Sequence, residues 1–139
     1  MKNIDDNIFL KFKKLFPFSC IDIILIEKNR FLLVRRAIPP YKNRLCLPGG
    51  IVKKNERLEQ AVSRIAKTEL GINVEIVKPV GFYEKIYRNR HDITHCYIVK
   101  KISKQIQLDN QASEFGMYKT IPKETAGFFK IMLNDAGFS

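Results

Sequence analysis

The chain has 139 residues, a formal net charge of +11 and an apolar content of 45%. This length suits one domain with a single substantial core, and the apolar content is ordinary for a globular protein. We therefore predict one domain over residues 1–139. Its longest apolar run, 21–26, is interrupted by Asp22 and is too short to span a bilayer. No secretory signal pattern is evident near the start, so we expect a cytoplasmic protein with no membrane partner.

The cysteines are three, scattered at Cys20, Cys46 and Cys96, and none stands in a C-x-x-C arrangement. This spacing is not typical of a metal site or of a disulfide framework. The sequence therefore predicts buried thiols in a reducing compartment.

The positive charge favours an anionic partner, such as a nucleoside diphosphate derivative. Nucleic acid is the alternative, because a basic surface is also its electrostatic footprint. No nucleic-acid-binding motif accompanies the charge, and the lysines fall in short clusters at 11–14, 53–54 and 100–104. Solvated lysines with no partner would give the same pattern. We expect a small anionic substrate and not nucleic acid.

The first predicted element is an amphipathic helix over residues 3–16. Apolar residues recur at helical spacing from Ile8 to Phe16, acidic residues precede them, and Pro17 ends the helix. Its apolar stripe needs a surface to cover. We expect that surface on the domain itself or on a partner subunit, in which case the chain would be a homodimer.

The next predicted elements are strands. The run 19–27 is continuously apolar around Asp22, which is typical of a strand buried on both faces. A turn at 28–29 leads into a second strand at 31–34, and two prolines make 38–44 a loop. The later segments are a strand at 73–80 that 81–87 continues, a polar turn at 88–92, strands at 93–102 and 115–120, a loop at 105–114 and a final helix at 123–134.

A stretch in the middle of the chain organises these elements. A short strand at 45–47 turns through Pro48, Gly49 and Gly50 and leads into a helix that Gly71 ends. In projection, Glu69 falls on the apolar stripe of that helix. A carboxylate there is costly unless it is paired or binds a cation. A buried Glu–Arg pair, an escape to solvent at the helix end and a bound metal all remain open. Strands on both sides of this helix predict a layered α/β (α+β) domain.

The same stretch resembles the Nudix box, G-x5-E-x7-R-E-U-x-E-E-x-G-U, in which U is aliphatic. The matching residues are Gly50, Glu56, Arg64, Glu69, Gly71 and Ile72. Ile65 and Thr68 stand where the box has glutamates. This reduced box is similar to that of the GDP-mannose mannosyl hydrolase branch of the Nudix family, and the likeness extends from about residue 19 to residue 118.

This resemblance implies a fold and a reaction. The fold would be an α/β/α sandwich around a mixed sheet, and the reaction would be Mg²⁺- or Mn²⁺-dependent hydrolysis of a nucleoside diphosphate derivative, such as a nucleotide sugar. It also implies a role for each matching position. The metal ligands would be Gly49 through its carbonyl, Glu69 and Gln111, the substrate would contact Arg36, Arg64 and Asp22, and Gly50, Glu56 and Gly71 would be structural.

Two departures from that branch affect the chemistry. Ile51 stands where the branch has an arginine, and Ala112 stands where it has a histidine that serves as general base. An alanine cannot accept a proton, so Glu114 and His91 are the nearest titratable candidates. A domain that binds a nucleotide or nucleic acid with little turnover is therefore the alternative to an enzyme.

Overall fold

The computed structural model describes residues 5–39, 41–103, 105–108 and 111–139. Residues 3–4 of the predicted first helix lie outside this part. The elements in chain order are α1 (Asp6–Leu15), β1 (Phe18–Glu27), β2 (Arg30–Arg36), β3 (Leu45–Cys46), β4 (Gly49–Ile51), α2 (Leu58–Ile65), the π-helical turn η1 (Ala66–Leu70), β5 (Asn73–Tyr87), β6 (Arg90–Ser103), β7 (Ala112–Tyr118) and α3 (Gly127–Asp135).

The sheet is mixed and is built around β1. The main order of strands is β3-β2-β1-β6-β5, and β1 runs parallel to β6 and antiparallel to β2. β4 pairs with the first half of β1, while β7 pairs with β2. β1 has hydrogen-bonded neighbours at both edges, and its residues 20–25 are buried on both faces, as its apolar run predicts.

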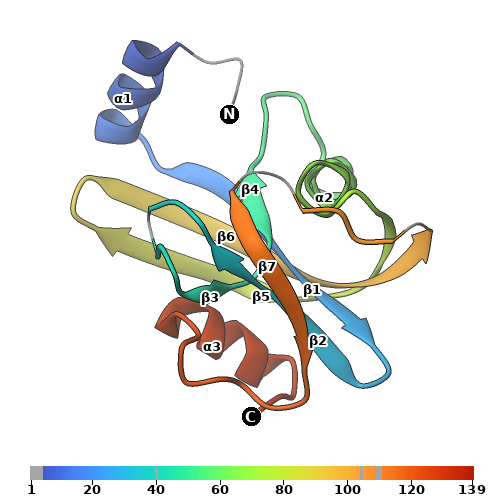
Figure 1. Cartoon of the computed structure of the whole chain (residues 1–139). Coiled ribbons are helices and arrows are strands. Elements are labelled where there is room, and N and C mark those ends of the chain that lie inside the picture. The colour runs from blue at the N-terminus through green and yellow to red at the C-terminus, as the bar shows by residue number, and fades with distance from the viewer. Residues whose placement is uncertain (1–4, 40, 104, 109–110) are drawn as a thin grey trace.

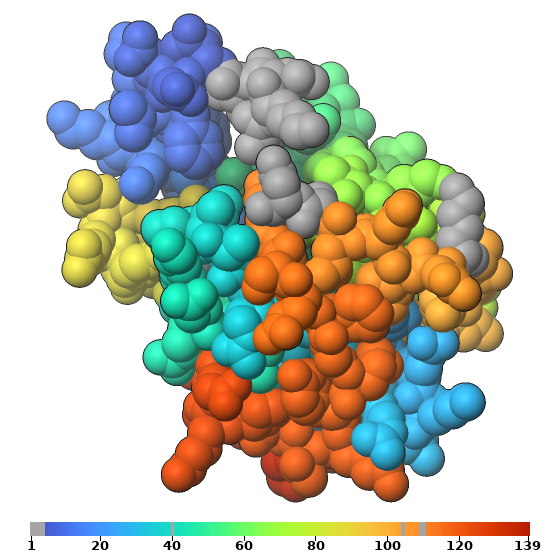
Figure 2. Space-filling model, viewed as in Figure 1, coloured from blue at the N-terminus to red at the C-terminus, as the bar shows by residue number. Residues whose placement is uncertain are grey.

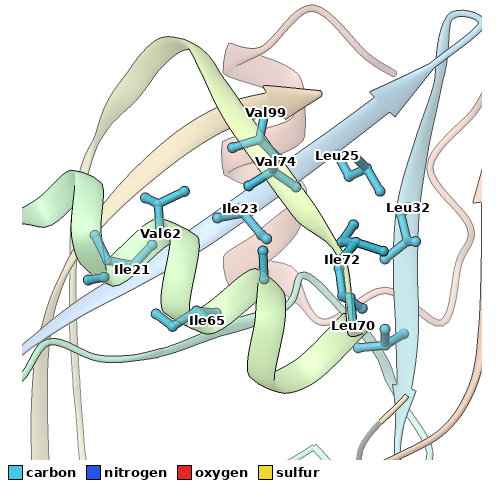
Figure 3. Close-up of a cluster of buried hydrophobic side chains, with 13 residues drawn as sticks. Ile21, Ile23, Leu25, Leu32, Val62, Ile65, Leu70, Ile72, Val74 and Val99 are labelled. Carbon is cyan, nitrogen blue, oxygen red and sulfur yellow. The ribbon is translucent and has the colours of Figure 1, made fainter. Parts of the chain in front are cut away.

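Alternation along β1 sends its side chains into two cores. Ile21, Ile23 and Leu25 pack under α2, whereas Ile24 packs on the α3 side. Figure 1 shows α2 and α3 on opposite faces of the sheet, and Figure 3 shows the cluster beneath α2. The predicted α/β (α+β) class and the sandwich around a mixed sheet are confirmed.

The β1–β2 hairpin turns at the predicted residues. Lys28 and Asn29 have φ values of 50° and 63°. Positive φ at both central residues is the geometry whose twist matches that of paired strands. This turn sets β2 in register with β1, with Ile26 opposite Phe31.

The central helix ends as the sequence predicts, but its last turn differs. Residues 66–70 form a π-helical turn, and Gly71 follows in the left-handed conformation with φ of 67°. Glycine adopts that conformation without a steric cost, which makes it a good residue to end a helix. The wider turn changes the angular position of Glu69 relative to the stripe that a regular α-helix would give.

Three predicted boundaries are wrong. β6 begins at Arg90, so the polar turn is only Arg88–Asn89, and β7 begins at Ala112 and not at 115. The last helix begins at Gly127 and not at 123. Residues 124–126 instead hydrogen-bond to the backbone of Leu45, with Leu45 N–H donating to Glu124 and Ala126 N–H donating to Leu45. Thr125 bridges Leu45 after a turn at 123–124, so the helix begins only at Gly127.

The helix α1 lies at the surface beside the tip of the β5–β6 hairpin (Figure 2). Asp5 caps its first turn by accepting a hydrogen bond from Asn7 N–H at 2.8 Å. The rings of Phe9 and Phe12 stack on Phe18 at 5.3 and 5.1 Å between centroids. None of its ten residues is buried. The helix thus rests on the domain through the stacking of two of its rings on Phe18, and covering by a partner subunit stays a prediction. Within the described residues, no helix is long and apolar enough to cross a membrane.

Candidate active site

A cleft of about 550 Å³ opens between the ends of α2 and α3. One end, which we call the box end, is lined by Gly49, Gly50, Arg64 and Glu69. The other, which we call the hairpin end, is lined by the tip of the β5–β6 hairpin and by loop and helix residues, namely Tyr41, Lys85, Tyr87, Arg90, Asp92 and Phe128. Asp22 and Arg36 also line the cleft.

An ion pair fixes the loop at the box end. Arg64 donates to both oxygens of Glu56, at 2.6 and 3.0 Å, and to the carbonyl of Ile51 at 2.8 Å. The backbone N–H of Lys53 also donates to Glu56, at 3.0 Å. These hydrogen bonds, led by those from Arg64, lower the pKa of Glu56. The pair ties the loop 51–56 to α2, as expected for structural residues, while Arg64 also reaches the cleft.

Asp22 packs directly on the backbone of Gly49, its partner across β1 and β4. A Cβ at position 49 would lie 1.9 Å from Asp22 Oδ1 and 2.5 Å from the carbonyl of Ile21. Only glycine therefore lets the carboxyl occupy this place. Asp22 is 8% exposed, and its burial, together with the charge of Asp92, raises its pKa to about 8. Its carboxyl faces the cleft.

The residues proposed to hold a metal lie on the same cleft. Gly49, Glu69 and Gln111 all line it, and they offer a carbonyl, a carboxylate and an amide oxygen. All are hard oxygen donors of the kind that Mg²⁺ and Mn²⁺ prefer. No group of three or more His, Cys, Asp or Glu suited to a metal occurs in the described part of the chain. The donor set thus fits a cation that draws further ligands from water and substrate, and does not form a closed protein site.

The neighbouring arginines at the end of β2 point to different places. Arg36 lines the cleft, and its guanidinium donates to the carbonyls of Ile38 and Pro39, both at 3.3 Å. Arg35 binds Glu114 at 2.5 Å and Glu124 at 3.1 Å. Because strand residues alternate, only one of the two can face the cleft, and it is Arg36.

The structure brings neither candidate base to the cleft. Glu114 lies opposite Arg35 in the β2–β7 ladder and accepts its hydrogen bond. His91 pairs with Glu84 at 3.0 Å, in a groove beside α1. Glu114 and His91 were proposed because they lie close in sequence to residues of the cleft. The alternation of side chains along β7 and β6 points both of them away from it.

Sequence reasoning missed the hairpin end. Lys85 and Asp92 are directly opposite in the β5–β6 ladder, as are Tyr87 and Arg90. Directly paired residues share a face, so the two pairs present four polar or aromatic side chains to the cleft. The alternation of Lys85 and Tyr87 was a usable signal. The places of Arg90 and Asp92 on β6 could not be predicted in this way, because they depend on the register of the hairpin.

Comparison with known proteins agrees with this geometry. The NUDIX domain family matches residues 18–136, so the chain belongs to the NUDIX family. An ADP-ribose pyrophosphatase of Methanocaldococcus jannaschii is 31% identical over 78% of this chain and 67% of its own length. The low-salt glycan biosynthesis protein Agl8 of Haloferax volcanii is 27% identical over 74% of this chain and 71% of its own length.

Solved structures share the fold. A MutT NUDIX hydrolase from Burkholderia pseudomallei superposes with a TM-score of 0.80 at 24% identity, over 86% of this chain and 97% of that one. Together, the family match and the pyrophosphatase relative support a hydrolase.

Proposed function

We propose that the chain hydrolyses a nucleoside diphosphate derivative with the help of Mg²⁺ or Mn²⁺. The observation that carries this proposal is the meeting of Arg36, Glu69 and Gln111 on one cleft, although they lie far apart in the sequence. A diphosphate resists attack because its oxygens repel the nucleophile, so a site for it needs a cation and positive side chains.

The chain's own residues would divide this work. Glu69, Gln111 and the carbonyl of Gly49 would hold the cation, which would withdraw charge from the diphosphate oxygens. Arg36 would hold those oxygens as a planar donor, with Arg64 as a secondary contact. Asp22 would stand beside them as a buried hydrogen-bonding group.

For the substrate class, we propose a nucleotide sugar or a close relative of one, with GDP-mannose as the compound that the reduced box suggests. The name of the M. jannaschii relative points to another sugar-bearing nucleoside diphosphate, ADP-ribose. Ala112 stands where the similar branch has its general base for attack at the sugar carbon, so we expect turnover of GDP-mannose by that route to be slow or absent.

A substrate panel tests this function. Purified protein is incubated with nucleotide sugars, ADP-ribose and nucleoside triphosphates, with Mg²⁺, with Mn²⁺ or with a chelator. We expect cation-dependent product release from a diphosphate derivative. In ¹⁸O-labelled water, label in the phosphate product means attack at phosphorus, and label in the sugar means attack at carbon.

A nucleotide-binding module with little turnover is the second candidate. It is favoured by the loss of the box acids at Ile65 and Thr68 and by the absence of a carboxylate-rich metal cluster in the described residues. Tight binding of a nucleotide with no product release under any cation would support this candidate and contradict hydrolysis.

A further inference from the structure

Aromatic rings surround the ammonium of Lys85 at the hairpin end of the cleft. Lys85 Nζ lies 3.9 Å from the ring centroid of Tyr41, 4.4 Å from that of Tyr87 and 5.3 Å from that of Phe128. Each distance is within the range of a cation–π contact. Burial lowers the pKa of Lys85, which Asp92 and Asp22 oppose by their charge.

These rings come from three separate segments. Tyr41 belongs to the loop after β2, Tyr87 to the end of β5 and Phe128 to the first turn of α3. Tyr87 neighbours Lys85 on the same strand, whereas the fold brings the rings of Tyr41 and Phe128 to it from distant parts of the sequence. Lys85 and these rings line the same cleft as Arg36, the candidate diphosphate contact.

The polar groups at this end are not equivalent. Asp92 accepts from Arg90 Nε at 2.7 Å, and the Arg90 guanidinium itself lies over the ring of Phe18 at 4.7 Å. Lys85 is the group that faces the rings, and an ammonium has three donors and no acceptor. A ligand that fits both features has a flat π-face for the rings and a carbonyl oxygen for the ammonium.

We propose that Lys85 with the rings of Tyr41, Tyr87 and Phe128 forms the subsite for the nucleobase, and that it selects bases with a carbonyl at position 6 of a purine or position 4 of a pyrimidine. This proposal rests on the proposed function for the nucleotide nature of the ligand and for the place of its diphosphate on Arg36. With the diphosphate on Arg36, the base lies at the hairpin end. There Lys85 donates to that carbonyl of hypoxanthine, guanine or uracil, while the amino group that adenine or cytosine carries at the same position would oppose its donors.

Binding without turnover tests this selection. Calorimetry in the presence of a chelator compares inosine diphosphate with adenosine diphosphate, which differ by a carbonyl in place of an amino group. We expect the inosine compound to bind more tightly by roughly tenfold to a hundredfold, because a hydrogen bond to a charged donor is at stake. Equal affinities, tighter binding of the adenosine compound or no binding of either would overturn the proposal.

Lys85→Met removes the ammonium and keeps an unbranched apolar side chain in its place. The variant should lose the preference for the inosine compound and bind both compounds alike. Lys78→Met, an exposed lysine on the same strand, is the matched control and should keep the preference. If Lys85→Met lowers only the melting temperature and the preference survives, Lys85 is merely a structural contact and the subsite is refuted.

The rings have their own variant. Tyr87→Leu should weaken both compounds by roughly fivefold or more, because stacking contributes for every base. Phe82→Leu is its control on the same strand, since Phe82 is 77% exposed. If the protein binds nucleotides selectively but does not hydrolyse them, the subsite is supported and the proposed hydrolysis is refuted. If it hydrolyses a diphosphate derivative without selecting the base, the proposed function is supported and the subsite is refuted.

Discussion

The box end and the hairpin end of the cleft are built in different ways. At the box end, Glu56 and Arg64 are eight residues apart and their contact is local. At the hairpin end, the rings of Tyr41 and Phe128 come from distant segments to contact Lys85, beside the ring of Tyr87 on the same strand. A short motif can therefore encode the first end, but the second exists only once the sheet and α3 are in place. The box end suits a task shared across a family, and the hairpin end suits the choice of one ligand.

The largest effect is expected at the box end, from the carboxylate of Glu69. Glu69→Gln should lower cation-dependent turnover by about a hundredfold or more, since it removes the only carboxylate in the proposed ligand set. Steady-state kinetics against Mg²⁺ concentration measures this loss. Glu59→Gln is the control, because it neutralises an exposed carboxylate on the preceding helix α2. This variant should keep wild-type rates. Full activity of Glu69→Gln with a chelator-sensitive wild type would rule out Glu69 as the ligand.

The next effect concerns the close packing at the box end. Gly49→Ala would place a methyl group on the Asp22 carboxyl and should lower the free energy of unfolding by about 1–3 kcal/mol. Gly127→Ala is the matched control, because no atom lies within 4 Å of its added Cβ. Chemical denaturation should show the control to be neutral or slightly stabilised. Equal stability of both variants would mean that Asp22 can move aside.

The pair at the box end should also give a pH signature. Glu56→Gln should cost about 1–3 kcal/mol of unfolding free energy at neutral pH, because it breaks a charged, half-buried hydrogen bond. The pKa of Glu56 is lower in the folded state than in the unfolded state, so its contribution is full above the unfolded pKa. It is lost as the pH falls through the folded pKa. The difference between wild type and variant should therefore shrink in acid, and a constant difference would contradict the ion pair.

The smallest effect is expected from substitution of the adjacent arginines Arg35 and Arg36, which should differ in outcome. Arg36→Ala should weaken binding of diphosphates by roughly tenfold, the value of a charged hydrogen bond. Arg35→Ala should instead lower stability and leave affinity little changed, because Arg35 bridges Glu114 and Glu124 away from the cleft. Calorimetric titration with a nucleoside diphosphate, paired with thermal unfolding, separates the outcomes. Equal losses of affinity would refute the assignment.

Much of the fold follows from local rules. The apolar run of β1, the turn at Lys28 and Asn29 and the helix end at Gly71 each need only short-range chemistry, and the structure confirms them. The start of α3 did not follow, because residues 124–126 are held by Leu45, far away in the sequence. Local propensity cannot anticipate such a partner.

The candidate site divides along the same line. The resemblance to the box implies structural and substrate roles for Glu56, Arg64 and Arg36, and their contacts agree with those roles. With Arg36 on the cleft, strand alternation turns Arg35 away from it. The places of Glu114 and His91 depend on which residues they oppose across a ladder, namely Arg35 and Ile86. Register is a property of two strands together, so proximity in sequence was a poor guide to either side chain.

The π-helical turn at residues 66–70 has a consequence for how this chain can evolve. An α-helix advances about 100° per residue, so removing one residue from that turn would rotate Glu69 by a similar angle about the helix axis. The carboxylate would then leave the side where Gly49 lies. An exposed residue of the turn that does not line the cleft, such as Lys67, should be exchangeable, whereas the number of residues in the turn should not change. Lineages that carry this chain should therefore tolerate substitutions in the turn and reject insertions and deletions there.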